Sequence, residues 1–315
     1  MKKDVEFISR GEKCRGWLIT PEQGKGPFPL VILAGGFCYV KEMVMPIYAD
    51  FFQAKGLAAL LFDYRNFGSS DGEVRQHINP SEQIEDYKNA ITFSESLPEV
   101  DPERIGIWGI SLSGAHVLNV GATDSRVKAI VSVVPMVDGW SCLNRNHGQR
   151  NFAKLNEICL ADRRNRFKTG KSGRITMSGE GSLLAEGETL AVFPDPEINE
   201  VFSMLKRTTA PSHEHWCTIE TAELFMEYNV WGCLNKIIDI PILMIVAEGD
   251  LICNWDEEIE VFNRIKSNKK ELFIQKRTSH MKMYSREENI KIAAKMSAEF
   301  CEKWLIKDPY QELIS

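Results

Sequence analysis

Short apolar runs alternate along this chain with longer segments in which apolar and polar residues are mixed. A strand buried on both faces needs a nearly continuous apolar sequence, whereas a helix on a sheet surface shows apolar residues at helical spacing. Strands that alternate with helices predict βαβ crossovers, and hence an α/β fold with a mostly parallel sheet covered by helices on both faces. The predicted strands include 29–34, 58–64, 128–134 and 241–247, and the predicted helices include 45–55, 80–97, 255–266 and 288–306.

Both ends of the chain carry further elements of this pattern. Residues 6–9 and 15–20 flank Gly11 and predict a β-hairpin, and residues 271–275 predict a last strand. Gly56 is expected to close the helix at 45–55, because glycine readily adopts the left-handed conformation at a helix end.

The alternation stops near residue 140 and resumes at 241. The residues between are polar and predicted to be irregular, with a Gly/Ser/Arg-rich part at 165–188 and a helical part after Pro196. Ligands of open α/β sheets bind at the carboxyl ends of the strands, where this segment is expected to lie. The sequence therefore predicts a core built from 1–140 and 236–315, with residues 141–235 inserted as a lid over the site.

The most informative motif is a short strand that runs into a Gly-x-Ser turn and then a helix, at residues 104–114. This is the setting of a nucleophile elbow, which exposes one serine hydroxyl and frees the next backbone N–H. Gly109 suits the strained turn, where a Cβ would clash. Ser111 is the candidate nucleophile. Ser113 stands where such motifs usually have glycine, with Gly114 one place later, and Ser113 is the less favoured alternative.

A serine needs a base within hydrogen-bond reach and an acid that orients the base. In chains with this elbow the partners follow in the order Ser, acid, His. Asp250 comes directly after the apolar strand 241–247, and His280 follows the last predicted strand. Both are therefore expected in strand-end loops near Ser111. The less favoured acids are Asp138 and Asp256, and the less favoured histidines are His77, His116, His147, His213 and His215.

The oxyanion of an acyl-transfer reaction needs two preorganised N–H donors. One is expected to be the backbone N–H of Leu112, which follows the nucleophile. The second is expected from the loop after strand 29–34, where Gly35 and Gly36 allow close backbone approach and the N–H of Phe37 is the best candidate. Cys38 and the hydroxyl of Tyr39 are weaker substitutes.

Composition narrows the class of protein further. The 315 residues are 43% hydrophobic and 26% charged, with a formal net charge of -6, which disfavours a nucleic-acid or anionic-membrane partner. The N-terminus lacks an apolar signal region and no run is long enough to span a membrane, so a cytoplasmic location is expected. One basic cluster is expected to be a solvated or substrate-gating surface: Arg163, Arg164, Arg166, Lys168 and Lys171.

Cysteines and histidines do not form a metal-binding pattern. The eight cysteines are scattered without a CxxC pair and are expected to be reduced and buried. His213 and His215 have no further ligand at a suitable spacing nearby. Neither a metal nor a cofactor is expected, and the Gly-x-Ser turn lacks the Gly-Lys-Ser/Thr ending of a phosphate-binding loop.

Three segments resemble one branch of the α/β-hydrolase family: 63–73 (DYRNFGSSDGE), 101–109 (DPERIGIWG) and 193–197 (FPDPE). This branch contains dienelactone-hydrolase-like and X-prolyl-peptidase-like bacterial hydrolases and fungal polyketide transferases. The resemblance covers nearly the whole chain and implies that Ser111, Asp250 and His280 form a triad under a lid. The branch usually has His-Gly where this chain has Gly35-Gly36.

The expected function is a cofactor-independent serine hydrolase that cleaves an ester or thioester through an acyl-enzyme on Ser111. An acyltransferase shares every step up to the acyl-enzyme and passes the acyl group to an alcohol or amine instead of water. A silent binding module is disfavoured, because all three triad positions are filled. The expected partner is a small-molecule acyl substrate, with a carrier-protein-bound or CoA-bound acyl group as an option. The oligomeric state stays open, with a homodimer among the options. Lid aromatics are candidates for an apolar pocket: Trp140, Phe193, Phe202, Trp216 and Phe225.

Overall fold

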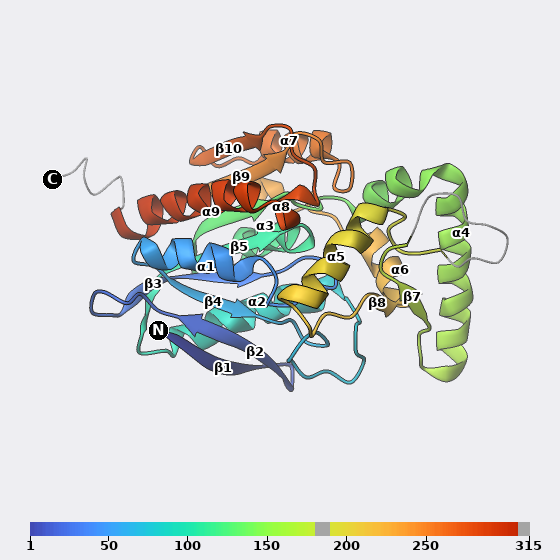
Figure 1. Ribbon diagram of the computed structural model, residues 1–315, viewed down its shortest axis with the longest axis horizontal. Coiled ribbons are helices and arrows are strands. Elements are labelled where there is room, and N and C mark those ends of the chain that lie inside the picture. The colour runs from blue at the N-terminus through green and yellow to red at the C-terminus, as the bar shows by residue number, and fades with distance from the viewer. Residues whose placement is uncertain (180–189, 308–315) are drawn as a thin grey trace.

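The computed structural model describes residues 1–179 and 190–307. An eight-stranded sheet with the strand order β1-β2-β4-β3-β5-β6-β9-β10 runs through the molecule (Figure 1). β2 pairs antiparallel with β1 and β4, and all other neighbours are parallel. The predicted α/β class with a mostly parallel sheet is confirmed. The strands are β1 (Lys2–Ser9), β2 (Glu12–Ile19), β3 (Phe28–Ala34), β4 (Ala58–Phe62), β5 (Val100–Ile110), β6 (Val127–Val133), β9 (Ile242–Ala247) and β10 (Lys270–Gln275).

The burial of each strand explains its sequence. β4 and β9 are buried along their whole length, which is why their residues are apolar throughout. β1 lies at the sheet edge, and buried residues alternate with exposed ones toward its end. The β1–β2 hairpin turns at Arg10 and Gly11, which both have positive φ angles of 48° and 90°. A two-residue turn of this hand needs positive φ at both positions, which suits Gly11.

Helices cover both faces of the sheet. α1 packs against α9 on one face, and α2 packs against α3 on the opposite face, where the right-handed crossover after β9 also places α7 (Figure 1). Gly56 follows α1 with a φ of 79°, in the left-handed conformation expected of a helix-closing glycine. The helices are α1 (Met45–Ala54), α2 (Pro80–Glu95), α3 (Leu112–Thr123), α7 (Trp255–Arg264), α8 (Lys282–Ser285) and α9 (Glu287–Glu302), with a π turn η2 (Lys303–Lys307) at the end.

The segment between β6 and β9 leaves the sheet and returns to it at the neighbouring strand. Its main elements gather at one end of the molecule, on the right of Figure 1. They are α4 (Gly139–Thr169), β7 (Arg174–Thr176), α5 (Pro196–Thr208), β8 (Trp216–Thr218) and α6 (Ile219–Glu227), and β7 pairs with β8 in a separate two-stranded sheet. The 3-10 turn η1 (Leu234–Lys236) follows and contacts α3 and α7. We call residues 141–235 the inserted segment.

The prediction of an irregular start to the inserted segment is wrong. α4 spans 31 residues and is interrupted at Gly148, whose φ of 67° is not helical. The helix was hidden because long stretches of it face solvent and carry polar residues, so no continuous apolar spacing marks it. The helix expected after Pro196 is α5. Of the Gly/Ser/Arg-rich part, residues 180–188 lie outside the described residues.

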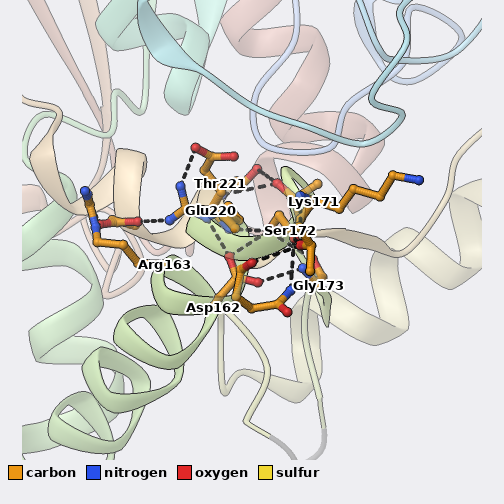
Figure 2. Close-up of polar contacts among 12 residues, drawn as sticks. Asp162, Arg163, Lys171, Ser172, Gly173, Glu220 and Thr221 are labelled. Carbon is orange, nitrogen blue, oxygen red and sulfur yellow. Dashed lines mark hydrogen bonds and ion pairs between the residues drawn. The ribbon is translucent and has the colours of Figure 1, made fainter.

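Ion pairs hold the inserted segment together (Figure 2). Arg166 of α4 is hydrogen-bonded to Asp162 at 2.8 Å and to Glu220 of α6 at 2.6 Å, and it also pairs with Glu223. Arg163 pairs with the same Glu223. The expectation of a solvated or substrate-gating cluster is therefore wrong for Arg166, which is largely withdrawn from solvent and binds α4 to α6, whereas Arg163 makes its ion pair while staying exposed. Arg164, Lys168 and Lys171 are exposed.

Asp162 extends this network to the chain that follows α4. Its carboxylate accepts hydrogen bonds from the Ser172 hydroxyl at 2.9 Å and from the Gly173 backbone N–H at 2.7 Å. The Ser172 hydroxyl oxygen accepts in turn from the Glu220 N–H at 3.1 Å (Figure 2). The turn after α4 is thus held by a buried carboxylate rather than by apolar packing.

Candidate active site

The turn between β5 and α3 places Ser111 at the carboxyl end of the sheet. Ser111 has φ 59° and ψ -122°, a strained conformation for a non-glycine residue. Its N–H donates to Val133 O at 2.9 Å, and its carbonyl accepts from Met136 N at 3.0 Å. The backbone is thereby held against the end of β6 while the side chain turns outward. This strained strand-to-helix turn is the geometry of a nucleophile elbow.

Close backbone packing explains the glycines around the serine. A Cβ on Gly109 would lie 2.2 Å from Ser113 O, and a Cβ on Gly114 would lie 2.9 Å from Val133 O. Gly114 thus gives α3 its close approach to β6, one position later than usual. The Ser113 hydroxyl points into the packing between α3 and the sheet, where it lies 2.8 Å from the Tyr64 hydroxyl. Ser113 is fully buried there, which disfavours it as a nucleophile.

Asp250 and His280 meet in the loops that follow β9 and β10. His280 Nδ1 lies 2.6 Å from Asp250 Oδ2, and both side chains are buried. The other carboxylate oxygen accepts from the backbone N–H groups of Ile252 and Cys253 at 2.9 and 2.8 Å. With Nδ1 donating to the carboxylate, Nε2 of His280 is left to act as a base.

The Ser111 hydroxyl interacts with two side chains from the segments that follow β9 and β10, Cys253 and Tyr284. Its Oγ is 3.9 Å from Cys253 Sγ. Burial raises the pKa of the Tyr284 hydroxyl well above its usual value, and a hydrogen bond with Ser111 opposes that rise. The Tyr284 ring packs on the His280 ring, with 5.4 Å between centroids. Among the contacts of the described residues no hydrogen bond joins Ser111 to His280, a contact that often tightens only when substrate binds.

The rival acids are engaged elsewhere. Asp138 caps α4 by accepting from Ser141 N at 3.0 Å, and it also accepts from the Trp231 indole at 2.8 Å. Asp256 pairs with Arg145 at 2.8 Å. Neither is bonded to His280.

The rival histidines are bonded within the core or the inserted segment. His116 lies 2.9 Å from both the Tyr228 hydroxyl and Gln83 Oε1, and burial lowers its pKa to about 3. His116 is therefore a neutral core residue. The others contact the side chain of Thr218 (His77), the carbonyl of Val192 (His147), the carbonyl of Cys38 (His213) and the side chain of Ser178 (His215).

The loop after β3 lies directly beside the nucleophile. A Cβ on Gly36 would be 2.9 Å from Ser111 Cβ and 3.3 Å from its Oγ, and a Cβ on Gly35 would overlap the Tyr39 ring. Both glycines are thus required by close approach. Leu112, as the first residue of α3, has no intrahelical acceptor for its N–H. Leu112 and Phe37 stay the predicted oxyanion donors. The Tyr39 ring lies against Tyr284, 6.0 Å away.

Aromatic residues of the inserted segment cover this loop. The Phe37 ring meets Phe193 at 5.2 Å and Phe225 at 5.3 Å, both edge to face. Ser111, which lies beside Gly36 of the same loop, is only 8% exposed. Two other expected pocket residues lie away from this cluster: Trp216 packs under Arg174 at 3.9 Å, and Trp140 is 53% exposed.

Comparison with known proteins agrees with this geometry. The model of the X-Pro dipeptidyl-peptidase (S15) family matches residues 17–282. The chain belongs to this family. The match runs from β2 to the start of α8 and includes Ser111, Asp250 and His280. The predicted resemblance to α/β hydrolases is confirmed.

The chain is also similar to proteins named as a thiohydrolase and a polyketide transferase. The thiohydrolase AneE of Aspergillus aculeatus is 30% identical over 88% of this chain and 86% of its own. The polyketide transferase GrgF of Penicillium sp. is 29% identical over 89% of this chain and 90% of its own. The crystal structure of the α/β hydrolase GrgF from Penicillium sp. sh18 superposes with a TM-score of 0.81 at 25% identity, covering 97% of this chain and 99% of that one.

Three residues lie beside the candidate site although the sequence did not predict a role for them there. Cys253 and Tyr284 lie three and four residues after Asp250 and His280, and His213 reaches the oxyanion loop from the inserted segment. No motif marks them, because their positions depend on how separate loops meet.

Metal-binding groups and cysteines can now be placed. Within 1–179 and 190–307, potential metal ligands come together at Asp250, Cys253 and His280, where ligand atoms lie within 4.8 Å of one another. Two of these ligands are already hydrogen-bonded to each other. All eight cysteines are free and buried. Of the helices that the structure describes, none combines the length and apolar character needed to cross a membrane.

Proposed function

We propose that this chain is a serine hydrolase that cleaves a small-molecule ester or thioester through an acyl-enzyme on Ser111. The single observation that carries the proposal is the 2.6 Å contact between His280 Nδ1 and buried Asp250, next to a serine on a strained elbow. The names of the AneE and GrgF relatives, a thiohydrolase and a polyketide transferase, support an acyl substrate.

In the proposed mechanism, Ser111 Oγ attacks the acyl carbon while His280 Nε2 takes its proton. Asp250 holds the imidazole in the required tautomer, and the N–H groups of Leu112 and Phe37 stabilise the tetrahedral oxyanion. His280 then gives the proton to the leaving alcohol or thiol. Water attacks the acyl-enzyme in the second half, with His280 again as base, and the acid leaves.

An acyltransferase is the second candidate. The burial of Ser111, at 8% exposure beside a loop that the inserted segment contacts, favours it, because a buried acyl-enzyme resists water until an acceptor binds. In this scheme residues 141–235 act as a lid that controls access of water, alcohol or amine. The acyl donor is a free, CoA-bound or carrier-protein-bound thioester.

Intact-mass analysis tests both schemes. The protein is incubated with a fluorophosphonate probe and with short and long acyl thioesters, first alone and then with alcohol or amine acceptors. We expect the probe and the acyl group to add to Ser111 and to be absent from Ser111→Ala. Labelling that persists in Ser111→Ala, or that maps to Ser113, would contradict the proposal. Acyl adducts that last in water and vanish with an acceptor would favour the transferase.

A further inference from the structure

The chain from the end of α5 to the start of β8 makes several contacts with the loop that follows β3. The Ser212 hydroxyl donates to Glu42 at 3.0 Å, and the Cys38 thiol lies 3.6 Å from the Trp216 carbonyl. Between these two contacts, His213 Nδ1 lies 3.0 Å from the Cys38 carbonyl oxygen. Cys38 directly follows Phe37, the proposed oxyanion donor. The inserted segment thus contacts the backbone of the oxyanion loop as well as its aromatic side chain.

Hydrogen-bond chemistry fixes the tautomer of His213. A carbonyl oxygen only accepts, so His213 Nδ1 carries the proton. His213 Nε2 then accepts from His215 Nδ1, 3.2 Å away, and His215 Nε2 accepts from the Ser178 hydroxyl at 2.7 Å. Burial lowers the pKa of His213 to about 4, in agreement with a neutral ring. The chain of donors therefore runs in one direction, from Ser178 to the Cys38 carbonyl.

The Cys38 backbone needs such support. Its φ of 51° lies in the left-handed region, which costs a residue other than glycine free energy and persists only where the surroundings hold it. His213 is 1% exposed, and its ring packs against Phe202 of α5 at 5.1 Å. The donor is thus rigid, as a group that holds a strained loop must be.

We propose that His213 is a positioning residue that fixes the oxyanion loop, so that the inserted segment completes the hole as well as covering it. The inference rests on the proposed function, since it presumes that Phe37 N–H faces the oxyanion of a Ser111 adduct. An oxyanion donor stabilises the transition state only when it is already in place, because moving it during the reaction would cost free energy. Loss of the His213 bond should therefore slow acylation more than it weakens substrate binding.

The test compares three substitutions at this position. His213→Phe keeps an aromatic ring but removes the donor, His213→Asn keeps an amide N–H near the place of Nδ1, and His213→Gln puts its amide near the place of Nε2. We expect kcat for a thioester to fall about 10- to 100-fold in His213→Phe and His213→Gln, with KM within threefold, by analogy with losing one oxyanion donor. His213→Asn should recover most of kcat.

A transition-state analogue separates positioning from packing. A trifluoromethyl ketone forms a hemiketal oxyanion on the serine, so its affinity should fall across the variants in proportion to kcat/KM. His147→Phe is the matched control, since His147 is a buried histidine of the same segment that bonds Val192 O and not the loop. Its kcat should stay within twofold of the starting protein.

Two results would overturn the inference: kcat within twofold in both His213→Phe and His213→Gln, or a change in KM alone. If His213→Phe does not fold, the ratio of kcat between His213→Asn and His213→Gln tests the inference. Hydrogen exchange at residues 36–39 gives a readout independent of activity and should rise in His213→Gln but not in His147→Phe. Fluorophosphonate labelling of the starting protein at Ser111 judges the proposed function separately from these ratios.

Discussion

The sheet and the inserted segment hold their side chains by different means. Asp250 and His280 follow β9, which is buried along its whole length, and the edge strand β10, which pairs with it in parallel register, so their positions depend on backbone ladders. In its described residues, the inserted segment has a single two-stranded sheet of three residues per strand. Besides buried apolar residues, its contacts are ion pairs, histidine rings and aromatic edges. The sheet can therefore hold the catalytic side chains in fixed positions. The inserted segment can change the shape and solvation of the site at a lower cost in stability.

The largest expected effect lies in the sheet region, at Asp250. Loss of the orienting carboxylate costs on the order of 10⁴ in turnover, because the imidazole adopts the wrong tautomer. We expect Asp250→Asn to lose kcat by this factor, measured with a thioester substrate. Asp138→Asn is the matched control, since Asp138 caps α4 and bonds Trp231 instead. The opposite ranking would move the acid to the loop after β6.

Gly36→Ala should give the next largest effect. The added Cβ would lie 2.9 Å from Ser111 Cβ and 3.1 Å from Ile110 O, so the loop must move away from the serine. We expect kcat to fall on the order of 10², as when one oxyanion donor is lost. Gly232→Ala is the control, because Gly232 is exposed, its φ is not positive and no atom lies within 4 Å of the added Cβ. Equal activity of Gly36→Ala and the starting protein would contradict the assigned oxyanion loop.

The sheet could be predicted because central strands such as β3, β4 and β9 are buried on both faces. The apolar runs at 29–34 and 241–247 predict buried strands. Because these strands are parallel, the loops after β5, β9 and β10 lie at the same edge of the sheet. The pairing of Asp250 with His280 follows from that edge and from chain order. Tyr284 and Cys253 could not be foreseen, because their contacts with Ser111 depend on loop paths that no periodic pattern records.

The inserted segment resisted prediction for a physical reason. α4 has a polar exposed surface and a break at Gly148, so its sequence lacks the apolar stripe of a core helix. The sequence predicts that Arg166 is a surface cation, yet it forms ion pairs with three carboxylates of α4 and α6. Long-range polar contacts of this kind depend on geometry that local sequence does not contain.

Replacing Arg166 tests whether ion pairs hold the inserted segment. Arg166→Met leaves the buried Asp162 carboxylate without its charged partner, and removing one member of such a network should cost about 2–3 kcal/mol of unfolding free energy. Arg164→Met, on the exposed side of the same helix, should change stability by less than about 0.5 kcal/mol. Denaturant unfolding of the two variants measures the difference. Equal stabilities would show that apolar packing alone holds α4.

The pH dependence of stability should also reveal the inserted segment. Burial, helped by His215 and Lys206, lowers the pKa of His213 to about 4. An unfolded histidine binds a proton below about pH 6.5, so the folded state loses stability as the pH falls from 6.5 toward 4. The loss should reach roughly 2 kcal/mol at pH 5 for this one residue.

The buried carboxyl of Glu258 acts in the opposite direction, because burial raises its pKa well above the usual value. The measurement is therefore the difference between the starting protein and His213→Asn, taken by denaturant unfolding at pH 5 and pH 7. The starting protein should lose more stability on acidification than the variant. Parallel curves would show that His213 takes up its proton equally in both states.

The smallest expected effect concerns the choice of acyl substrate. It is tested by comparing substitutions of Phe193 and Trp216. The Phe193 ring supports Phe37 beside the serine, whereas Trp216 packs under Arg174 and donates its indole N–H to Glu214. Phe193→Ala should open space next to the acyl group and change the kcat/KM ratio of long to short acyl thioesters about fivefold, roughly 1 kcal/mol. Trp216→Ala should leave that ratio unchanged, and both variants should keep fluorophosphonate labelling of Ser111. If the two variants shift the ratio equally, the inserted segment acts as a whole on the site. If neither shifts it, acyl specificity lies in the loops of the sheet, and the division of roles between the two regions fails.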